Sequence, residues 1–336
     1  MKIMRTLRGT PKHLSRTGQL SGFKYLMLSL PFKCNYRCLK CFNLTNNQPT
    51  TGVREITISE IQCVIEAARV LGGRVVVIAG EGEPTLDRNI QEIVSMINGA
   101  GMIPIIYSNG STLTSRMADF YRENDVCLVI ALDSLVPALH KCLMGTKTEL
   151  LPLVLKNLTN LRRLYAGTIE DKEGLQILRL ALNMTMNSPN KGEVEAIKAY
   201  AGTDMYFICN PLNRIGNAEG NWSKLIESEQ DFALQQELAR KHSESGGPLT
   251  LDKIGVCGYS INGIGIGAYG HYMTCAYTMR SNGLLGTIRD RSLKEVYELK
   301  SRLEREHYAK NGIVPCLVRA SSFHVFLETL SAGASK

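Results

Sequence analysis

The stretch Lys33-Cys-Asn-Tyr-Arg-Cys-Leu-Lys-Cys-Phe42 decides the interpretation of the fold, because it places Cys34, Cys38 and Cys41 in a C-x3-C-x2-C pattern directly after the first predicted strand. Three thiolates on one loop can each bind a different iron of a cubane iron–sulfur cluster, since soft sulfur ligands suit iron. The fourth iron is then left for another ligand. A structural zinc ion is the alternative, but it needs a fourth Cys or His nearby, and the following stretch Phe42–Gln62 contains neither.

Outward from this loop, short apolar runs alternate with amphipathic stretches of helix length, which is typical of βα units and a parallel sheet. The predicted strands are Tyr25–Pro31, Arg74–Gly80, Ile103–Ser108, Val126–Asp133, Gln176–Thr185 and Met205–Cys209, and the helices between them are Ser59–Leu71, Asn89–Ala100, Thr114–Glu123, Leu151–Leu164 and Glu193–Ala201. Such a chain predicts an α/β fold, a partial (β/α)6 TIM-like barrel whose ligands bind at the carboxyl ends of the strands. After Asn210 the pattern changes to Gly- and Asn-rich connections with a further helix at Gln230–Lys241, which indicates a smaller C-terminal module.

Composition excludes several classes of protein. The 336 residues are 44% hydrophobic and 21% charged, which is ordinary for a globular chain and not for a disordered or collagen-like one. No apolar run approaches the ~18 residues of a membrane span, and ten cysteines without a secretory signal pattern predict a cytoplasmic protein with reduced thiols. The segment Lys2–Arg54 has ten basic residues and no acidic one. Such a segment can bind nucleic acid or an acidic or phosphorylated ligand, or it can form a solvated edge of the protein.

Polar motif residues follow the later strands as well. The segments are Gly80-Glu-Gly-Glu-Pro-Thr-Leu86, Ser108-Asn-Gly110, Leu132-Asp-Ser134, Asn183-Met-Thr-Met-Asn187 and Arg214-Ile-Gly216. Taken alone, each of these short segments is of a kind that is common in turns. Their order and their strand-end placement, together with the cysteine loop, resemble the radical S-adenosylmethionine (radical SAM) superfamily, and the resemblance covers most of residues 24–216.

The resemblance implies a [4Fe-4S] cluster on the three loop cysteines and S-adenosylmethionine as the second cofactor. The residues implied as S-adenosylmethionine contacts are Phe42, Gly82, Glu83, Pro84, Ser108, Asn109, Ser134 and Asn183. Reductive cleavage of S-adenosylmethionine then yields a 5′-deoxyadenosyl radical that abstracts a substrate hydrogen, with a flavodoxin- or ferredoxin-type protein as electron donor. Two residues depart from the family's pattern: Lys40 stands where an aromatic residue is usual, and Ala131 stands where Ser is usual. Phe42 is therefore expected to supply the aromatic contact.

Beyond the barrel, Cys257, Gly270 and Cys275 form a Cys-x12-Gly-x4-Cys pattern, and Cys316 follows later. This resembles the SPASM/twitch extension, which implies one auxiliary [4Fe-4S] cluster on Cys257, Cys275 and Cys316. The fourth iron of that cluster is then open or held by a further ligand, such as Cys209. The alternative is that the tail cysteines are small buried hydrophobes. Packing roles are expected for Cys63, Cys127 and Cys142.

The predicted organisation is a basic N-terminal arm at 1–23, a radical SAM partial barrel at 24–216 and a small iron–sulfur module at 217–336. The first hypothesis for function is hydrogen abstraction from a small polar metabolite, namely a sugar, aminocyclitol or nucleoside, leading to oxidation, decarboxylation or epimerisation. The alternative is maturation of a ribosomally made precursor peptide, but few residues precede the first strand for a separate peptide-recognition domain. A non-enzymatic iron–sulfur or zinc protein that binds nucleic acid would leave the segment Gly82-Glu-Pro84 unexplained.

Overall fold

The computed structural model describes residues 3–30, 33–43, 54–172, 174–244, 250–251, 256–275 and 285–311. Its strands are β1 Met4–Leu7, β2 Tyr25–Leu28, β3 Val75–Ile78, β4 Ile103–Ser108, β5 Cys127–Ala131, β6 Glu170–Lys172, β7 Leu175–Leu178, β8 Leu180–Met186, β9 Tyr206–Pro211, β10 Thr250–Leu251, β11 Val256–Cys257, β12 Gly263–Ile266 and β13 Tyr272–Met273. Its α-helices are α1 Pro11–Arg16, α2 Ile58–Val70, α3 Ile90–Gly99, α4 Ser115–Glu123, α5 Pro137–Met144, α6 Leu151–Tyr165, α7 Val194–Ala201, α8 Asn217–Gly220, α9 Trp222–Leu225, α10 Glu229–His242, α11 Gly258–Ile261 and α12 Leu293–Asn311. Short 3-10 helices are η1 Pro84–Leu86, η2 Ala166–Thr168 and η3 Ser188–Glu193.

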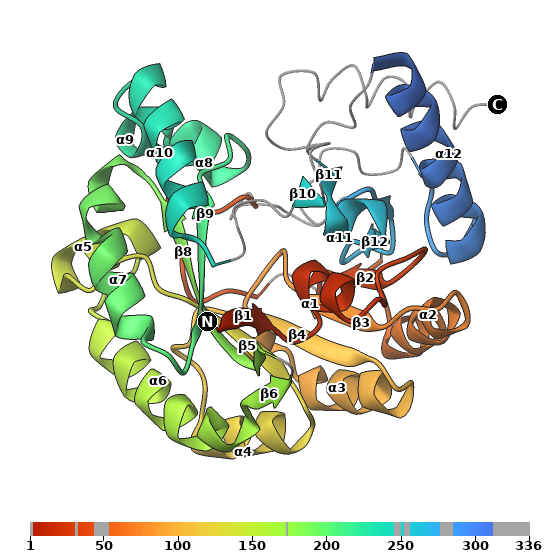
Figure 1. Ribbon diagram of the computed structural model, residues 1–336, viewed down its shortest axis with the longest axis horizontal. Helices are drawn as coiled ribbons and strands as arrows, with labels where there is room; N and C mark the ends of the chain where they lie inside the picture. The colour runs from red at the N-terminus through yellow and green to blue at the C-terminus, as the bar shows by residue number, and fades with distance from the viewer. Residues whose placement is uncertain are drawn as a thin grey trace. The chain divides into compact units, whose positions relative to one another are not determined.

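Eight strands form the main sheet in the order β13-β12-β2-β3-β4-β5-β8-β9. The pairs β12–β2, β2–β3, β4–β5, β5–β8 and β8–β9 are parallel, and β13 lies antiparallel to β12. Along the chain, helices alternate with the strands from β2 to β5, and α7 lies between β8 and β9; Figure 1 labels these elements. The predicted α/β class with a partial TIM-like barrel is confirmed, because parallel neighbours joined through helices are the defining pattern of that fold.

The chain divides into two compact units. Unit 1 comprises Met1–Arg16, Cys34–Asn47 and Ile105–Pro248, and unit 2 comprises Thr17–Lys33, Gln48–Pro104 and Leu249–Lys336. The cysteine loop therefore belongs to unit 1, and the segment Gly80–Leu86 belongs to unit 2.

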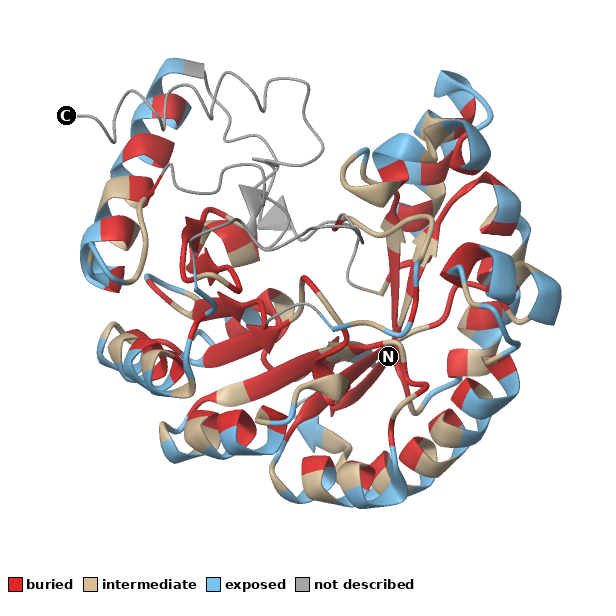
Figure 2. Cartoon of the chain, turned by 180° about the vertical axis from the view of Figure 1, so that it is seen from behind, coloured by how far each residue is buried: buried red, intermediate tan, exposed pale blue. Residues whose placement is uncertain are grey.

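In unit 1 the strands β5 and β8 are mostly buried, which explains why most of their residues are apolar, and the polar Asn183 and Thr185 are the half-buried residues of β8. Helix α6 presents Val154, Leu158 and Leu161 on one buried face, at the spacing of an amphipathic helix. Figure 2 shows the same pattern, with buried strands in red and pale blue residues on the outer faces of the helices.

The N-terminal segment is more ordered than the predicted basic arm implies. Strand β1 pairs in parallel with β7 in a three-stranded sheet of order β1-β7-β6, and helix α1 follows it. Leu7 and Leu14 are fully buried, so the segment contributes apolar area to unit 1 as well as charge.

The single strand predicted over Gln176–Thr185 is two strands, β7 and β8, which meet at Arg179. The buried Arg179 guanidinium pairs with Asp125 at 2.9 Å and donates to the carbonyl oxygen of Arg122 at 2.9 Å. At this residue the chain passes from the small sheet into the main sheet. The apolar pattern continues through both strands, and this is why the sequence alone does not predict the break.

Unit 2 gains a strand from the tail of the chain. Strand β12 pairs in parallel with β2, in a register that places Gly263 opposite Tyr25. A Cβ at Gly263 would lie 2.6 Å from the carbonyl oxygen of Tyr25, so only glycine allows the two strands this approach. Helix α12, which pattern reasoning did not predict, begins after a reciprocal cap between Ser292 and Glu295. Within the described ranges, no helix combines the length and the apolar character that crossing a membrane requires.

Candidate active site

The cysteine loop of unit 1 holds three half-buried thiols, and none of them is in a disulfide. The backbone N–H of Tyr36 donates to Cys34 Sγ at 3.4 Å, and the Cys38 thiol donates to Met144 Sδ at 3.5 Å. Hydrogen bonds to a ligating sulfur are one of the levers by which a protein tunes an iron–sulfur cluster.

Electrostatics disfavours free thiolates at this place. Burial raises the pKa of Cys38 and of Cys41, and the neighbouring Cys41 and Cys34 raise the pKa of Cys38 further. Lys40 acts in the opposite direction on both thiols. Thiolates here require a compensating positive charge, which iron ions would supply.

The donor set fits an iron–sulfur cluster, because a cubane cluster takes thiolates on different irons. Among the described residues, no three or more His, Cys, Asp or Glu side chains are arranged to hold one metal ion. A cluster does not need that arrangement, since its cysteines do not converge on a single ion.

A buried tyrosine anchors the loop. Tyr36, only 2% exposed, packs in a cluster with Leu143 and Met144 of α5 and with Leu212, and the side chains of Cys34 and Cys38 pack against the same cluster. Sequence reasoning did not single out Tyr36, because an aromatic residue inside a cysteine motif has no spacing signal of its own.

Helix α5 and the residue after it fix the loop backbone from one side. The N–H groups of Arg37 and Leu39 donate to the carbonyl oxygens of Met144 and Leu143, at 3.0 and 2.9 Å. The helix ends at Gly145 in the left-handed region, with φ of 59°, where a Cβ would overlap the carbonyl oxygen of Arg37. Gly145 therefore serves both as a helix terminator and as a close-approach residue.

The turn that leads into α8 fixes the loop from another side. The Ala218 N–H donates to the Cys41 carbonyl oxygen at 3.2 Å, and the Asn217 side chain donates to the Cys38 carbonyl oxygen at 3.3 Å. Gly216, with φ of 61°, lies so close that a Cβ would overlap the backbone of Phe42. These contacts give the predicted Arg214-Ile-Gly216 turn a local role in unit 1.

The residues after β4 contact the loop through a ring of side chains. Asn109 Nδ2 donates to Asn35 Oδ1 at 2.9 Å, Asn35 Nδ2 donates to Ser111 Oγ at 2.8 Å, and Ser111 Oγ donates to Asn109 Oδ1 at 2.7 Å. Ser108 Oγ accepts from the N–H of Gly110 at 3.0 Å. Ser108 and Asn109 stay predicted cofactor contacts, and Asn35, which bonds to Asn109, was not singled out from the sequence.

Two further predicted contacts have protein partners in unit 1. The buried Ser134 hydroxyl donates to Glu193 Oε1 at 2.6 Å. Asn183 Oδ1, in the middle of β8, accepts from Asn210 Nδ2 of β9 at 2.7 Å. Phe42 is half-buried beside Cys41.

In unit 2 the segment Gly80–Leu86 leaves β3 in a tight turn. Gly80 has φ of 139°, and Glu83 N–H donates to the carbonyl oxygen of Lys33 at 2.6 Å. A Cβ at Gly82 would lie 2.5 Å from that same oxygen, which explains the glycine. The buried Glu83 carboxylate accepts from the N–H and the hydroxyl of Thr85, at 3.2 and 2.6 Å, and so caps η1.

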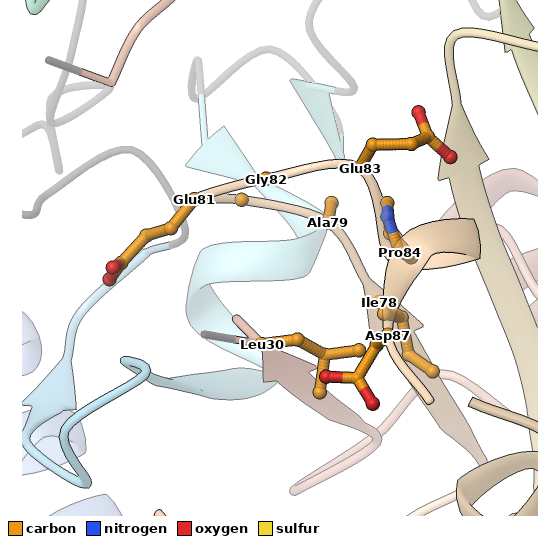
Figure 3. A pocket seen from close by; sticks show the side chains of 9 residues that line it. Leu30, Ile78, Ala79, Glu81, Gly82, Glu83, Pro84 and Asp87 are labelled. Carbon is orange, nitrogen blue, oxygen red and sulfur yellow. The ribbon is translucent and has the colours of Figure 1, made fainter. Parts of the chain in front are cut away.

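A small hollow lies over this segment, lined by Leu30, residues 78–84 and Asp87. Figure 3 shows the carboxyl groups of Glu81 and Glu83 on opposite sides of Gly82. Glu81 is 6% exposed and lies 3.5 Å from the N–H of Ala268, and its burial raises its pKa to about 7. Glu81 is thus a buried carboxyl that sequence reasoning passed over, because only its motif neighbours carried a signal.

The remaining cysteines divide by exposure. Cys127 and Cys209 are fully buried, and burial raises the pKa of each thiol to about 12. The packing prediction is confirmed for Cys127, whereas Cys63 on α2 and Cys142 on α5 are exposed and that prediction is wrong for them. Among the tail cysteines, Cys275 is half-buried after β13. The Cys257 side chain and Cys316 lie outside the described residues.

The close approach at Gly216 generates a first test. A Gly216→Ala substitution is expected to destabilise the protein by about 1–3 kcal/mol, because alanine is strained at positive φ and its Cβ overlaps the Phe42 backbone. Iron retained after reconstitution should fall as the loop shifts. Urea unfolding and iron analysis measure both effects. The matched control is Gly220→Ala in α8, where a Cβ meets nothing within 4 Å. Equal losses in both variants would contradict the role given to Gly216.

Comparison with known proteins agrees with this geometry. Residues 28–169 match the family model described as the radical SAM superfamily. The GTP 3′,8-cyclase of Synechococcus elongatus is 33% identical over 126 residues, which are 37% of this chain and 38% of that protein. A probable GTP 3′,8-cyclase of Thermococcus kodakarensis is 32% identical over 120 residues, 36% of this chain and 38% of that protein. The chain thus spans less than two fifths of the length of these curated relatives.

Solved structures share the fold at low identity. Streptococcus suis SuiB bound to the precursor peptide SuiA has a TM-score of 0.57 at 15% identity, covering 85% of this chain and 67% of that one. Native anSMEcpe with bound AdoMet has a TM-score of 0.55 at 14% identity, covering 93% and 97%. The fold, the strand-end cysteine loop and the family match agree with one another: residues 28–169 of this chain match the radical SAM superfamily.

Proposed function

We propose that this protein is a radical SAM enzyme, with a [4Fe-4S] cluster on Cys34, Cys38 and Cys41 and S-adenosylmethionine recognised by Gly82, Glu83 and Pro84. The observation that carries the proposal is the cysteine loop, whose backbone is held by donors and acceptors from α5 and from the turn before α8. A loop fixed in this way keeps three thiols in place for a cluster, because hydrogen bonds of its backbone groups position the loop.

When bound, the cluster and S-adenosylmethionine supply a one-electron reductive cleavage whose 5′-deoxyadenosyl radical abstracts hydrogen from the substrate. The residues of the chain bind these two cofactors and orient them. The Tyr36 N–H donates to Cys34 Sγ, and the buried Tyr36 ring excludes water from one side of the loop. Glu83 presents a buried carboxylate, a suitable acceptor for the ammonium group of the methionine moiety. Phe42, Ser108, Asn109, Ser134 and Asn183 remain the proposed contacts of the rest of S-adenosylmethionine.

For the substrate we favour a small polar metabolite such as a sugar, aminocyclitol or nucleoside, with oxidation, decarboxylation or epimerisation as the outcome. The support is that the GTP 3′,8-cyclases, to which part of this chain is similar, act on GTP, as their name says, and GTP is a small polar nucleotide. A precursor peptide is the second candidate, since SuiB was solved bound to one. A flavodoxin- or ferredoxin-type protein is the proposed electron donor, and the proposed location is cytoplasmic.

The proposed activity is tested by the cleavage of S-adenosylmethionine. Anaerobically reconstituted protein with dithionite should form 5′-deoxyadenosine and methionine, and Cys38→Ala should form neither, because one thiolate of the cluster is lost. Chromatography of the products measures both. Cys63→Ala, which removes an exposed cysteine of α2, is the matched control and should keep the activity. A folded, iron-loaded wild type that leaves S-adenosylmethionine intact refutes the proposal.

The role given to Glu83 is tested by its isosteric amide. Glu83→Gln keeps an oxygen that can accept from Thr85 but removes the negative charge. Charge-assisted hydrogen bonds contribute roughly 1.5–3 kcal/mol, so S-adenosylmethionine affinity should fall about ten- to a hundredfold with iron content unchanged. Equilibrium binding measures the affinity, and Glu92→Gln on the exposed side of α3 is the control. Unaltered affinity in Glu83→Gln would remove Glu83 from the site.

An auxiliary [4Fe-4S] cluster on Cys257, Cys275 and Cys316 is part of the proposal, supported by the tail pattern and by the half-buried position of Cys275. Wild-type protein should then bind about eight irons, the sum of two four-iron clusters, and Cys275→Ala about four. The Cys275→Ala protein should still cleave S-adenosylmethionine, because the first cluster is intact. Saturation of the wild type at about four irons would show that the tail carries no cluster.

A further inference from the structure

An unexpected charge sits inside the cysteine loop. Lys40 directly precedes Cys41, and its side chain is 10% exposed. Its Nζ forms an ion pair with Oδ2 of Asp133, at the carboxyl end of β5, and the Asp133 side chain is completely buried. The residue that departs from the family's usual aromatic therefore has a dedicated partner within unit 1.

Asp133 is fixed so that one oxygen is left for Lys40. Its Oδ1 accepts from the N–H of Thr185 in β8 at 3.0 Å, and its backbone carbonyl accepts from Asn190 Nδ2 at 2.9 Å. Within the part of the chain that the structure describes, Oδ2 has no hydrogen-bond partner and meets the Lys40 ammonium alone. The carboxylate is thus held by the barrel and directed at the cysteine loop.

The charges in this place matter because the surroundings are buried. A buried ion pair has little net charge, whereas removal of one member leaves an uncompensated charge whose field is weakly screened. The reduction potential of an iron–sulfur cluster depends on the net charge around it. Lys40 lies between the ligands Cys38 and Cys41 in the chain, so an uncompensated charge here acts on the cluster directly.

We propose that Asp133 is a positioning residue for the cluster loop: it holds the Lys40 ammonium and cancels its charge, so that the pair sets the reduction potential of the cluster. This inference rests on the proposed cluster at Cys34, Cys38 and Cys41. Lys40 and Asp133 touch neither substrate nor reacting atoms in this role, and they act through the loop and through their charges.

The test is a double-substitution cycle of Asp133 and Lys40. The quantity measured is the midpoint potential of the one-electron couple of the cluster. The protein is titrated with dithionite in the presence of mediators, and the reduced cluster is followed by electron paramagnetic resonance. Asp133→Asn leaves a lone ammonium and should raise the potential. Lys40→Gln leaves a lone carboxylate and should lower it. The double variant should return toward the wild-type value, because the net charge is again zero. A merely structural role does not produce shifts of opposite sign that cancel.

Two more variants complete the design. Lys40→Arg keeps the positive charge and should keep the wild-type potential. Lys191→Gln breaks another lysine–aspartate pair of unit 1, the one with Asp231 at 2.8 Å, and should leave the potential unchanged. Asp133→Asn gives the decisive value, because it removes one charge and leaves the Lys40 side chain, which lies in the cysteine loop itself, unchanged.

The outcomes separate the two proposals. An iron-loaded Asp133→Asn protein whose potential is unchanged or lowered overturns the role of the ion pair and leaves the proposed function standing. The same holds if Lys40→Arg shifts the potential as far as Lys40→Gln. Wild-type protein that takes up no iron at the loop refutes the proposed function, and the inference falls with it.

Discussion

The gathering of three cysteines on one half-buried loop is the constraint on which unit 1 depends. Burial and mutual proximity raise the pKa of Cys38, and burial raises that of Cys41, so the thiolate form is unfavourable there without a cation. The chain keeps these groups in place by other means: the Tyr36 ring is buried, and the loop backbone bonds to α5 and to the turn before α8. Apolar packing and backbone hydrogen bonds, which do not depend on the metal, thus hold the three cysteines together although their electrostatics is unfavourable.

Close backbone approach is the second recurring device. Gly145 and Gly216 lie against the carbonyl groups of the cysteine loop in unit 1, and Gly82 lies against Lys33 in unit 2. At each of these positions a Cβ would collide with backbone, which cannot rotate away as a side chain can. Glycine therefore determines how closely the strand-end segments pack, and the side chains beside it are placed as a consequence.

Five of the six predicted strands and the helices predicted between them agree with the structure, because apolar periodicity reports burial and burial follows the fold. The cysteine loop and the Gly82–Pro84 segment could be found for a different reason, since spacing and strand-end position are both visible in sequence. The partners of Asn35 and Lys40 could not be predicted, because a hydrogen bond or ion pair between residues far apart in the chain leaves no periodic signal in the sequence. The break at Arg179 could not be predicted either: the partner of this residue, Asp125, is far from it in the chain, and the apolar pattern continues across the break.

Sequence and fold similarity extend over different parts of the chain, and the difference bears on the substrate. Identity of about one third to the GTP 3′,8-cyclases covers only about 37% of this chain, whereas the fold likeness to SuiB and anSMEcpe covers 85–93% of it at 14–15% identity. The family model likewise ends at residue 169, before β8 and β9. Residues that handle a cofactor common to many enzymes are expected to keep their identity, while those that shape a substrate site diverge on a retained fold. The determinants of substrate choice are therefore best sought beyond residue 169, beginning with Asn210 near the end of β9, whose side chain donates to Asn183 of β8.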